Sequence, residues 1–73
     1  MSKTIFITGA GSGIGEASIR LYHQHGWIVG AYDINKKAVN RLKDELGERC
    51  ISGYIDVTDV NSVKQAFDEF AQH

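Results

Sequence analysis

The stretch from Thr8 to Gly15 constrains the fold of this chain most, because it places four glycines within eight residues. It directly follows the β-branched and aromatic run Thr4–Ile7 and directly precedes a segment with helical spacing. Glycine lacks a Cβ atom, so its backbone can turn tightly and approach a ligand closely. The following helix points unpaired N–H groups and the positive end of its dipole at this turn. The stretch predicts a site for an anionic group such as a diphosphate; the plainer alternative is a turn that only reverses the chain.

Apolar runs alternate with segments of helical spacing and predict three strands, each followed by a helix. The strands are expected over residues 3–8, 27–32 and 51–55. This order implies a parallel sheet joined by right-handed crossovers. In a doubly wound sheet the three strands lie in the order 3-2-1, with the first two helices on one face and the third on the other. We therefore predict a three-layer α/β fold, βαβαβα, in which residues 1–73 form the N-terminal half of a Rossmann-type domain.

The three helical segments have recognisable ends and apolar faces. Gly26 suits the C-terminus of the first helix, Asn35 and Gly47 bound the second, and Thr58 or Asp59 can cap the third. The residues expected to be buried are Ile14, Ala17, Leu21 and Tyr22 in the first helix, Ala38, Val39, Leu42 and Leu46 in the second, and Val63, Ala66, Phe67 and Phe70 in the third.

The glycine spacing separates two kinds of dinucleotide loop. The pattern G-x-G-x-x-G does not fit, because its third glycine, counted from Gly11, would fall on Glu16. The pattern that does fit is T-G-x-x-x-G-x-G, formed by Thr8, Gly9, Gly13 and Gly15. It resembles the cofactor loop of the short-chain dehydrogenase/reductase family, which implies a Rossmann fold, a nicotinamide cofactor and a parent enzyme that is an oxidoreductase. The resemblance covers nearly the whole chain but only the opening part of the family's usual length.

Asp33 ends the second predicted strand, eighteen positions after Gly15. In a dinucleotide-binding fold an acid at this place accepts hydrogen bonds from the adenosine ribose and repels a 2′-phosphate. We therefore expect NAD as the cofactor rather than NADP, although the neighbouring Lys36 and Lys37 weaken this preference because a cation tolerates a phosphate. The alternative is an acid that complements the dipole of the following helix.

The family resemblance implies further cofactor contacts. It implies that Asp56 contacts the adenine amino group with help from the backbone of Val57, whereas the plainer interpretation of Asp56 is a turn acid. Ser12 and Ile14 would line the loop and contact the diphosphate through backbone groups. The full set of expected cofactor-binding residues is Gly9, Ser12, Gly13, Ile14, Gly15, Asp33, Asp56 and Val57.

The catalytic residues of the family have no counterpart in this sequence. The Asn-Ala-Gly segment, the catalytic Ser and the Tyr-x-x-x-Lys helix are all missing. Tyr32 and Lys36 have the Tyr-x-x-x-Lys spacing, but they start at a strand end, and we interpret the match as coincidence. His23 and His25 do not share a helix face, so we expect no metal site. Hydride transfer needs a positioned nicotinamide and a proton donor, so we expect no turnover by this chain alone.

Composition excludes several classes of partner. The formal net charge is −1 and the basic residues are scattered, which argues against a nucleic-acid surface. The single cysteine, Cys50, cannot form an internal disulfide, fits a reducing compartment and is expected to be buried at a strand start. The sequence shows no long apolar segment or signal-like leader, which predicts a cytoplasmic protein without a membrane partner.

The first predicted strand leaves one edge of the sheet unpaired. After Lys3 this strand carries no charged residue that would discourage pairing with another strand. A chain of 73 residues is also shorter than a typical domain, so burial against a partner chain would add stability. We therefore predict a homodimer in which two first strands pair about a two-fold axis. A non-catalytic module that self-associates in this way is the alternative to a cofactor-binding function.

Overall fold

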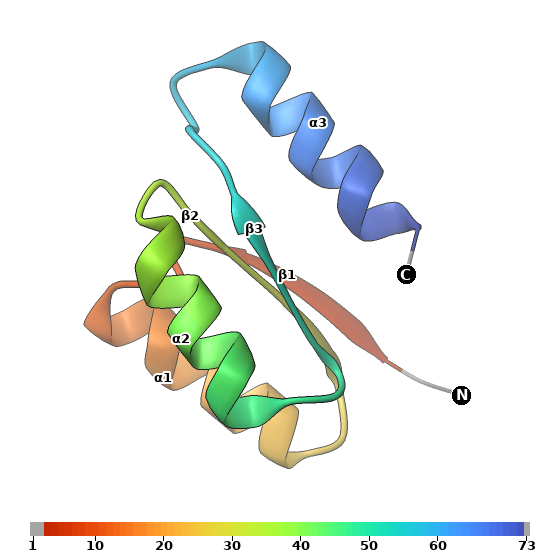
Figure 1. Cartoon of the computed structure of the whole chain (residues 1–73). Helices are drawn as coiled ribbons and strands as arrows, with labels where there is room; N and C mark the ends of the chain where they lie inside the picture. Colours follow the sequence, from red (N-terminus) through yellow and green to blue (C-terminus); the bar gives the residue numbers. More distant parts are fainter. Residues whose placement is uncertain (1–2, 73) are drawn as a thin grey trace.

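Three parallel strands and three helices alternate along residues 3–72, the part of the chain that the computed structural model describes (Figure 1). The strands are β1 (Thr4–Thr8), β2 (Ile28–Asp33) and β3 (Cys50–Tyr54), and the helices are α1 (Gly13–Gln24), α2 (Lys36–Leu46) and α3 (Val60–Ala71). The order across the sheet is β1-β2-β3, which confirms the predicted order 3-2-1. The first two strands begin one residue later than predicted, and the third begins one residue earlier, at Cys50, which is buried as expected.

The helices form two layers around the sheet. Figure 1 shows α1 and α2 together on one face and α3 on the opposite face, as predicted. Ile19, Val29 and Leu42 belong to the core between the sheet and the first two helices. A second core, between the sheet and α3, is built around Tyr32 and Ala66. Burial of each large apolar side chain contributes about 1.5–3 kcal/mol, so both cores hold the helices against the strands.

The buried stripe of α1 differs from the predicted one. Of the four residues expected to face the core, Tyr22 packs against it, whereas Ile14 is 85% exposed and Leu21 is 52% exposed. Ala17 is exposed as well. The buried residues of this helix are Gly15 and Ile19.

Gly15 explains why the buried stripe of α1 differs from the predicted one. A Cβ atom at this position would lie 2.1 Å from the carbonyl oxygen of Gly9 and 2.9 Å from the Cα atom of Ala10. The first turn of the helix therefore packs with its backbone directly on the loop. Ile19, four residues later, follows Gly15 on the same side and reaches the sheet.

The second helix has the ends and the apolar face that its sequence predicts. Asn35 caps it, because its side-chain oxygen accepts a hydrogen bond from the N–H of Ala38 at 3.2 Å. Gly47 ends it with a φ of 70°, in the left-handed region that favours glycine. Val39 and Leu42 are buried. Together these features place the first residues of α2 beside the end of β2.

The third helix is capped by Asp59, the second of the two candidates, whose carboxylate accepts hydrogen bonds from the N–H groups of Asn61 and Ser62. Ala66 is buried as expected. The predicted burial of Phe67 is wrong: this side chain is 52% exposed, although its ring lies 4.7 Å from that of Phe6. Within residues 3–72, no helix is both long enough and apolar enough to cross a membrane.

Candidate functional site

The loop between β1 and α1 contains glycines that serve different purposes. Gly9 has a φ of 68°, a conformation that side chains with a Cβ rarely adopt. Gly15 allows the close contact between the helix start and the loop. A Cβ atom on Gly13, in contrast, would meet nothing within 4 Å in the part of the chain that the structure describes. Backbone conformation therefore explains Gly9 and close packing explains Gly15, whereas open space lies beside Gly13.

Ser12 fixes the start of α1. Its hydroxyl donates to the carbonyl oxygen of Gly9 at 2.7 Å and accepts from the N–H of Gly15 at 3.4 Å. The N–H groups of Gly13 and Ile14 belong to the first turn, where no intrahelical carbonyl can accept from them. These two groups, together with the positive end of the helix dipole, make the helix start suited to an anion.

Asp33 lies in direct contact with the glycine-rich loop. Its Oδ2 atom accepts a hydrogen bond from the N–H of Gly11 at 2.8 Å, and its Oδ1 atom accepts one from the N–H of Asn35 at 2.8 Å. Each carboxylate oxygen has two lone pairs, so one acceptor site remains on each oxygen. The predicted ribose-binding acid and the predicted diphosphate loop thus lie side by side.

A cleft of about 260 Å³ opens next to this loop, at the carboxyl ends of the three strands. The residues that line it are Gly9, Asp33, Ile34, Ile55, Asp56, Val57 and Thr58. Four of them belong to the set expected from the sequence. Ile34 and Val57 are 63% and 64% exposed and give the cleft an apolar rim. Binding sites in open α/β sheets lie at this end of the strands, so the cleft is the leading candidate for a ligand site.

Sequence reasoning missed three residues of this cleft. Ile34, Ile55 and Thr58 line it but are not among the expected cofactor-binding residues, and Thr58 is expected only as a possible helix cap. Their positions offered a signal, because Ile55 ends a predicted strand and the other two follow one by at most three residues, where loops of a parallel sheet carry binding groups. Ser12, Gly13, Ile14 and Gly15 lie on the adjoining loop and helix start and are not part of the lining.

Thr58 holds the carboxylate of Asp56 in place. The Oδ1 atom of Asp56 accepts from the Thr58 hydroxyl at 2.7 Å and from the Thr58 N–H at 3.0 Å. The side-chain bond and then the backbone bond hold the pKa of Asp56 below its usual value, because both favour the charged form. The N–H of Asp56 donates to the hydroxyl of Ser62 at 2.9 Å. Asp56 therefore presents an ionised acceptor to the cleft.

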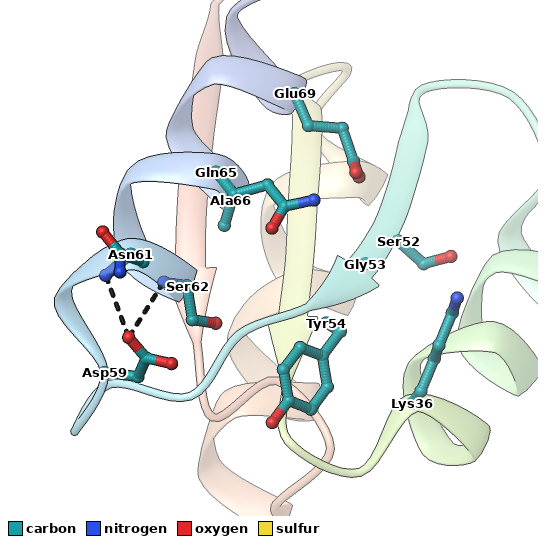
Figure 2. Close-up of a pocket in the computed structure, with 10 residues that line it drawn as sticks. All are labelled: Lys36, Ser52, Gly53, Tyr54, Asp59, Asn61, Ser62, Gln65, Ala66 and Glu69. Atoms are coloured by element: carbon teal, nitrogen blue, oxygen red, sulfur yellow. Dashed lines mark hydrogen bonds between the residues drawn. The ribbon is translucent and has the colours of Figure 1, made fainter.

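A larger cleft of about 370 Å³ lies between β3 and α3 and is shown in Figure 2. Two carboxylates, from Asp59 and Glu69, line it, with Lys36 across from them. Asp59 is the helix cap, and Glu69 accepts a hydrogen bond from the hydroxyl of the buried Tyr32 at 2.8 Å. Burial, together with this carboxylate, raises the pKa of Tyr32 well above its ordinary value. These acidic groups have structural partners and repel a diphosphate, so this cleft is not the candidate anion site.

Known proteins are similar to this chain in both sequence and fold. A sequence model of the short chain dehydrogenase family matches residues 3–73. Meso-2,3-butanediol dehydrogenase from Serratia marcescens is 38% identical to the chain over 72 residues, which are 97% of this chain and 29% of that protein. The chain therefore belongs to the short-chain dehydrogenase family, and it spans less than a third of the length of this relative.

Two solved structures carry the same arrangement of strands and helices. The 3-ketoacyl-(acyl-carrier-protein) reductase from Brucella melitensis, complexed with NADH, has a TM-score of 0.89 at 30% identity, covering 92% of this chain and 28% of that one. The closed form of serine dehydrogenase, complexed with NADP+, has a TM-score of 0.83 at 31% identity, covering 85% and 25%. Both proteins were solved with a nicotinamide dinucleotide.

Proposed function

We propose that this chain is the N-terminal, cofactor-binding portion of a short-chain dehydrogenase/reductase and binds the adenosine diphosphate half of NAD. The observation that carries this proposal is the contact between Asp33 and Gly11, beside the open space at Gly13. It brings a carboxylate suited to a ribose next to a helix start suited to a diphosphate. The NADH and NADP+ complexes of the two similar structures support a ligand of this class.

The diphosphate would lie over the first turn of α1. The N–H groups of Gly13 and Ile14 would donate to its oxygens, and the missing side chain of Gly13 leaves room for them. Gly9 and Gly15 act by shaping the loop, since one supplies a positive φ and the other the close contact to the helix. Ser12 acts by keeping the loop and the helix start together.

The adenosine would occupy the 260 Å³ cleft. The two remaining acceptor sites of Asp33 suit the paired hydroxyls of a ribose, and Ile34 and Val57 offer apolar contacts to a flat base. Asp56, held ionised by Thr58, would accept a hydrogen bond from the adenine amino group. Lys36 lines the larger cleft and is not among the residues that line the cleft beside Asp33. This arrangement favours NAD over NADP.

The whole enzyme would be an oxidoreductase, whereas this chain would bind the cofactor without turning it over. Tyr32 is not suited to act as the proton donor for hydride transfer. Its side chain is buried, its hydroxyl donates a hydrogen bond to Glu69, and its pKa is raised. An acid of this kind gives up its proton less readily than an ordinary tyrosine.

Calorimetric titration of the 73-residue chain with AMP, ADP-ribose and NAD tests the proposal. We expect binding in the millimolar to micromolar range, with ADP-ribose stronger than AMP because it carries the second phosphate. Asp33→Asn should weaken binding roughly tenfold or more, as expected for the loss of charge-assisted hydrogen bonds. Asp44→Asn removes the same charge from an exposed position on α2 and serves as the matched control. No binding of any of the three ligands would refute the proposal.

A second candidate function is self-association through β1. This strand lies at the edge of the sheet, and the half-exposed Phe67 of α3 packs against its Phe6, with 4.7 Å between the ring centroids. A copy of the chain could add its own β1 and cover these residues, giving one continuous sheet. Sedimentation equilibrium at increasing concentration tests this: a dimer supports it, and a monomer at high concentration contradicts it.

A further inference from the structure

The position of the Asp33 carboxylate depends on Gly11, a loop residue 22 positions away in the sequence. The N–H of Gly11 donates to Oδ2, while the N–H of Asn35 donates to Oδ1 from the other side. A carboxylate at the rim of an open cleft would otherwise rotate about its side-chain torsions. With both oxygens bonded to backbone groups, this carboxylate is held in one orientation.

The contact with Asp33 requires a glycine at position 11. Its φ lies outside the left-handed region, so the backbone does not demand a glycine here. A Cβ atom would instead lie 3.0 Å from Oδ2 of Asp33 and 2.9 Å from the Cβ atom of Ala38 on α2. Both distances are shorter than ordinary van der Waals contacts, so an alanine at this position displaces the carboxylate, α2 or both.

We propose that Gly11 is a positioning residue: by holding the Asp33 carboxylate in one orientation, it makes the site select adenosine ligands whose ribose 2′-hydroxyl is free. This proposal rests on the proposed function. The locked carboxylate keeps one acceptor site on each oxygen for the two ribose hydroxyls. It also cannot turn away from a 2′-phosphate, so the two negative groups would be forced together, which disfavours that ligand. A loosened Asp33 can move aside and accept either ligand.

The test compares two probes that differ only in the group at the 2′ position, AMP and adenosine 2′,5′-bisphosphate. We expect the wild-type chain to prefer AMP in calorimetric titrations. Gly11→Ala should reduce the ratio of AMP affinity to bisphosphate affinity roughly tenfold, because AMP loses its positioned acceptors and the bisphosphate escapes part of the repulsion. The variant Gly11→Ala/Ala38→Gly removes the crowding against α2 and keeps the crowding against Asp33. The ratio of its two affinities should therefore stay below that of the wild-type chain.

Three results would overturn the proposal, and they are distinguishable. If Asp33→Asn lowers the affinity ratio and Gly11→Ala leaves it unchanged, Gly11 has no part in selectivity, while the proposed function stands. If the double variant regains the wild-type ratio, the effect comes from α2 and not from Asp33. If the wild-type chain binds neither probe, the proposed function fails and this inference fails with it. Dispersed amide signals in NMR spectra of each variant serve as the check that it is folded.

Discussion

A Cβ atom on Gly15 would lie 2.1 Å from the carbonyl oxygen of Gly9, so the first turn of α1 rests on the loop without any side chain between them. This contact decides which stripe of α1 faces the sheet. It also fixes where the N–H groups of Gly13 and Ile14 point.

Gly15→Ala should therefore destabilise the fold strongly. The added methyl group meets backbone atoms, which cannot move aside as a flexible side chain can, and we expect a loss of at least about 2 kcal/mol in the free energy of unfolding. Urea denaturation provides the measurement. Gly13→Ala is the matched control: its Cβ atom enters open space, so this variant should lose no stability. Equal losses in the two variants would contradict this account of the loop.

Stability at alkaline pH should depend on Tyr32. Its pKa is raised in the folded chain, by burial first and then by Glu69, above the ordinary value of 10.0. Above pH 10 the unfolded chain loses this proton and the folded chain keeps it, so the free energy of unfolding should fall by about 1.4 kcal/mol per pH unit until the folded pKa is reached.

Tyr32→Phe removes this titration, so the two stability profiles should converge as the pH rises above 10 and cross within about one pH unit. Below pH 10 the variant should be less stable by about 0.5–1.5 kcal/mol, because it lacks the hydrogen bond to Glu69. Thermal or urea unfolding followed across the pH range measures both effects. Parallel profiles for the two proteins at alkaline pH would show that Tyr32 does not titrate differently in the folded chain.

The pKa of Asp56 should rise when Thr58 is replaced by valine. Thr58→Val removes the hydroxyl bond, the larger cause of the lowered pKa, and retains the bond from the backbone N–H. Titration of the Asp56 carboxyl carbon by NMR measures this change. We expect a partial return toward the ordinary value of 3.8. An unchanged Asp56 would mean that the hydroxyl does not hold this carboxylate.

Self-association should respond to a proline at the open edge of the sheet. The carbonyl of Lys3 accepts from the N–H of Ile28, and the alternation of the ladder then directs the N–H of Thr4 toward the open edge. Thr4→Pro removes this donor without breaking the ladder to β2, so it should weaken a dimer formed through β1. Thr4→Val keeps the donor and serves as the control. Identical sedimentation of the two variants would exclude pairing through this edge.

Much of the fold could be predicted from the sequence because the signals are local. Asn35 and Gly47 mark the ends of α2 by their own chemistry, and the alternation of strands and helices fixes the order of the sheet. The burial of Phe67 could not be predicted in this way, because helical spacing does not reveal how far a helix extends beyond the sheet it covers. Its ring stacks on Phe6 of the edge strand and stays half-exposed.

The candidate site, like the fold, could be predicted only in part from the sequence. Asp33 and the glycine loop could be identified because strand ends and loop spacing are visible in the sequence. The contact between Asp33 and Gly11 could not, since it joins residues 22 positions apart. Ile14 and Leu21 follow helical spacing, yet both are exposed, because the contact of Gly15 with the loop turns this stripe of α1 away from the core. Contacts of this kind depend on tertiary packing.

The most direct test of the central claim is an amide NMR titration of the 73-residue chain with ADP-ribose. If a diphosphate lies on the start of α1 and a ribose on Asp33, the largest shifts should fall on the N–H groups of Gly11, Gly13, Ile14 and Asn35. Residues around the cleft of Figure 2, such as Gln65, should change little. Shifts centred on that cleft, or no shifts at all at saturating ligand, would contradict the proposed site.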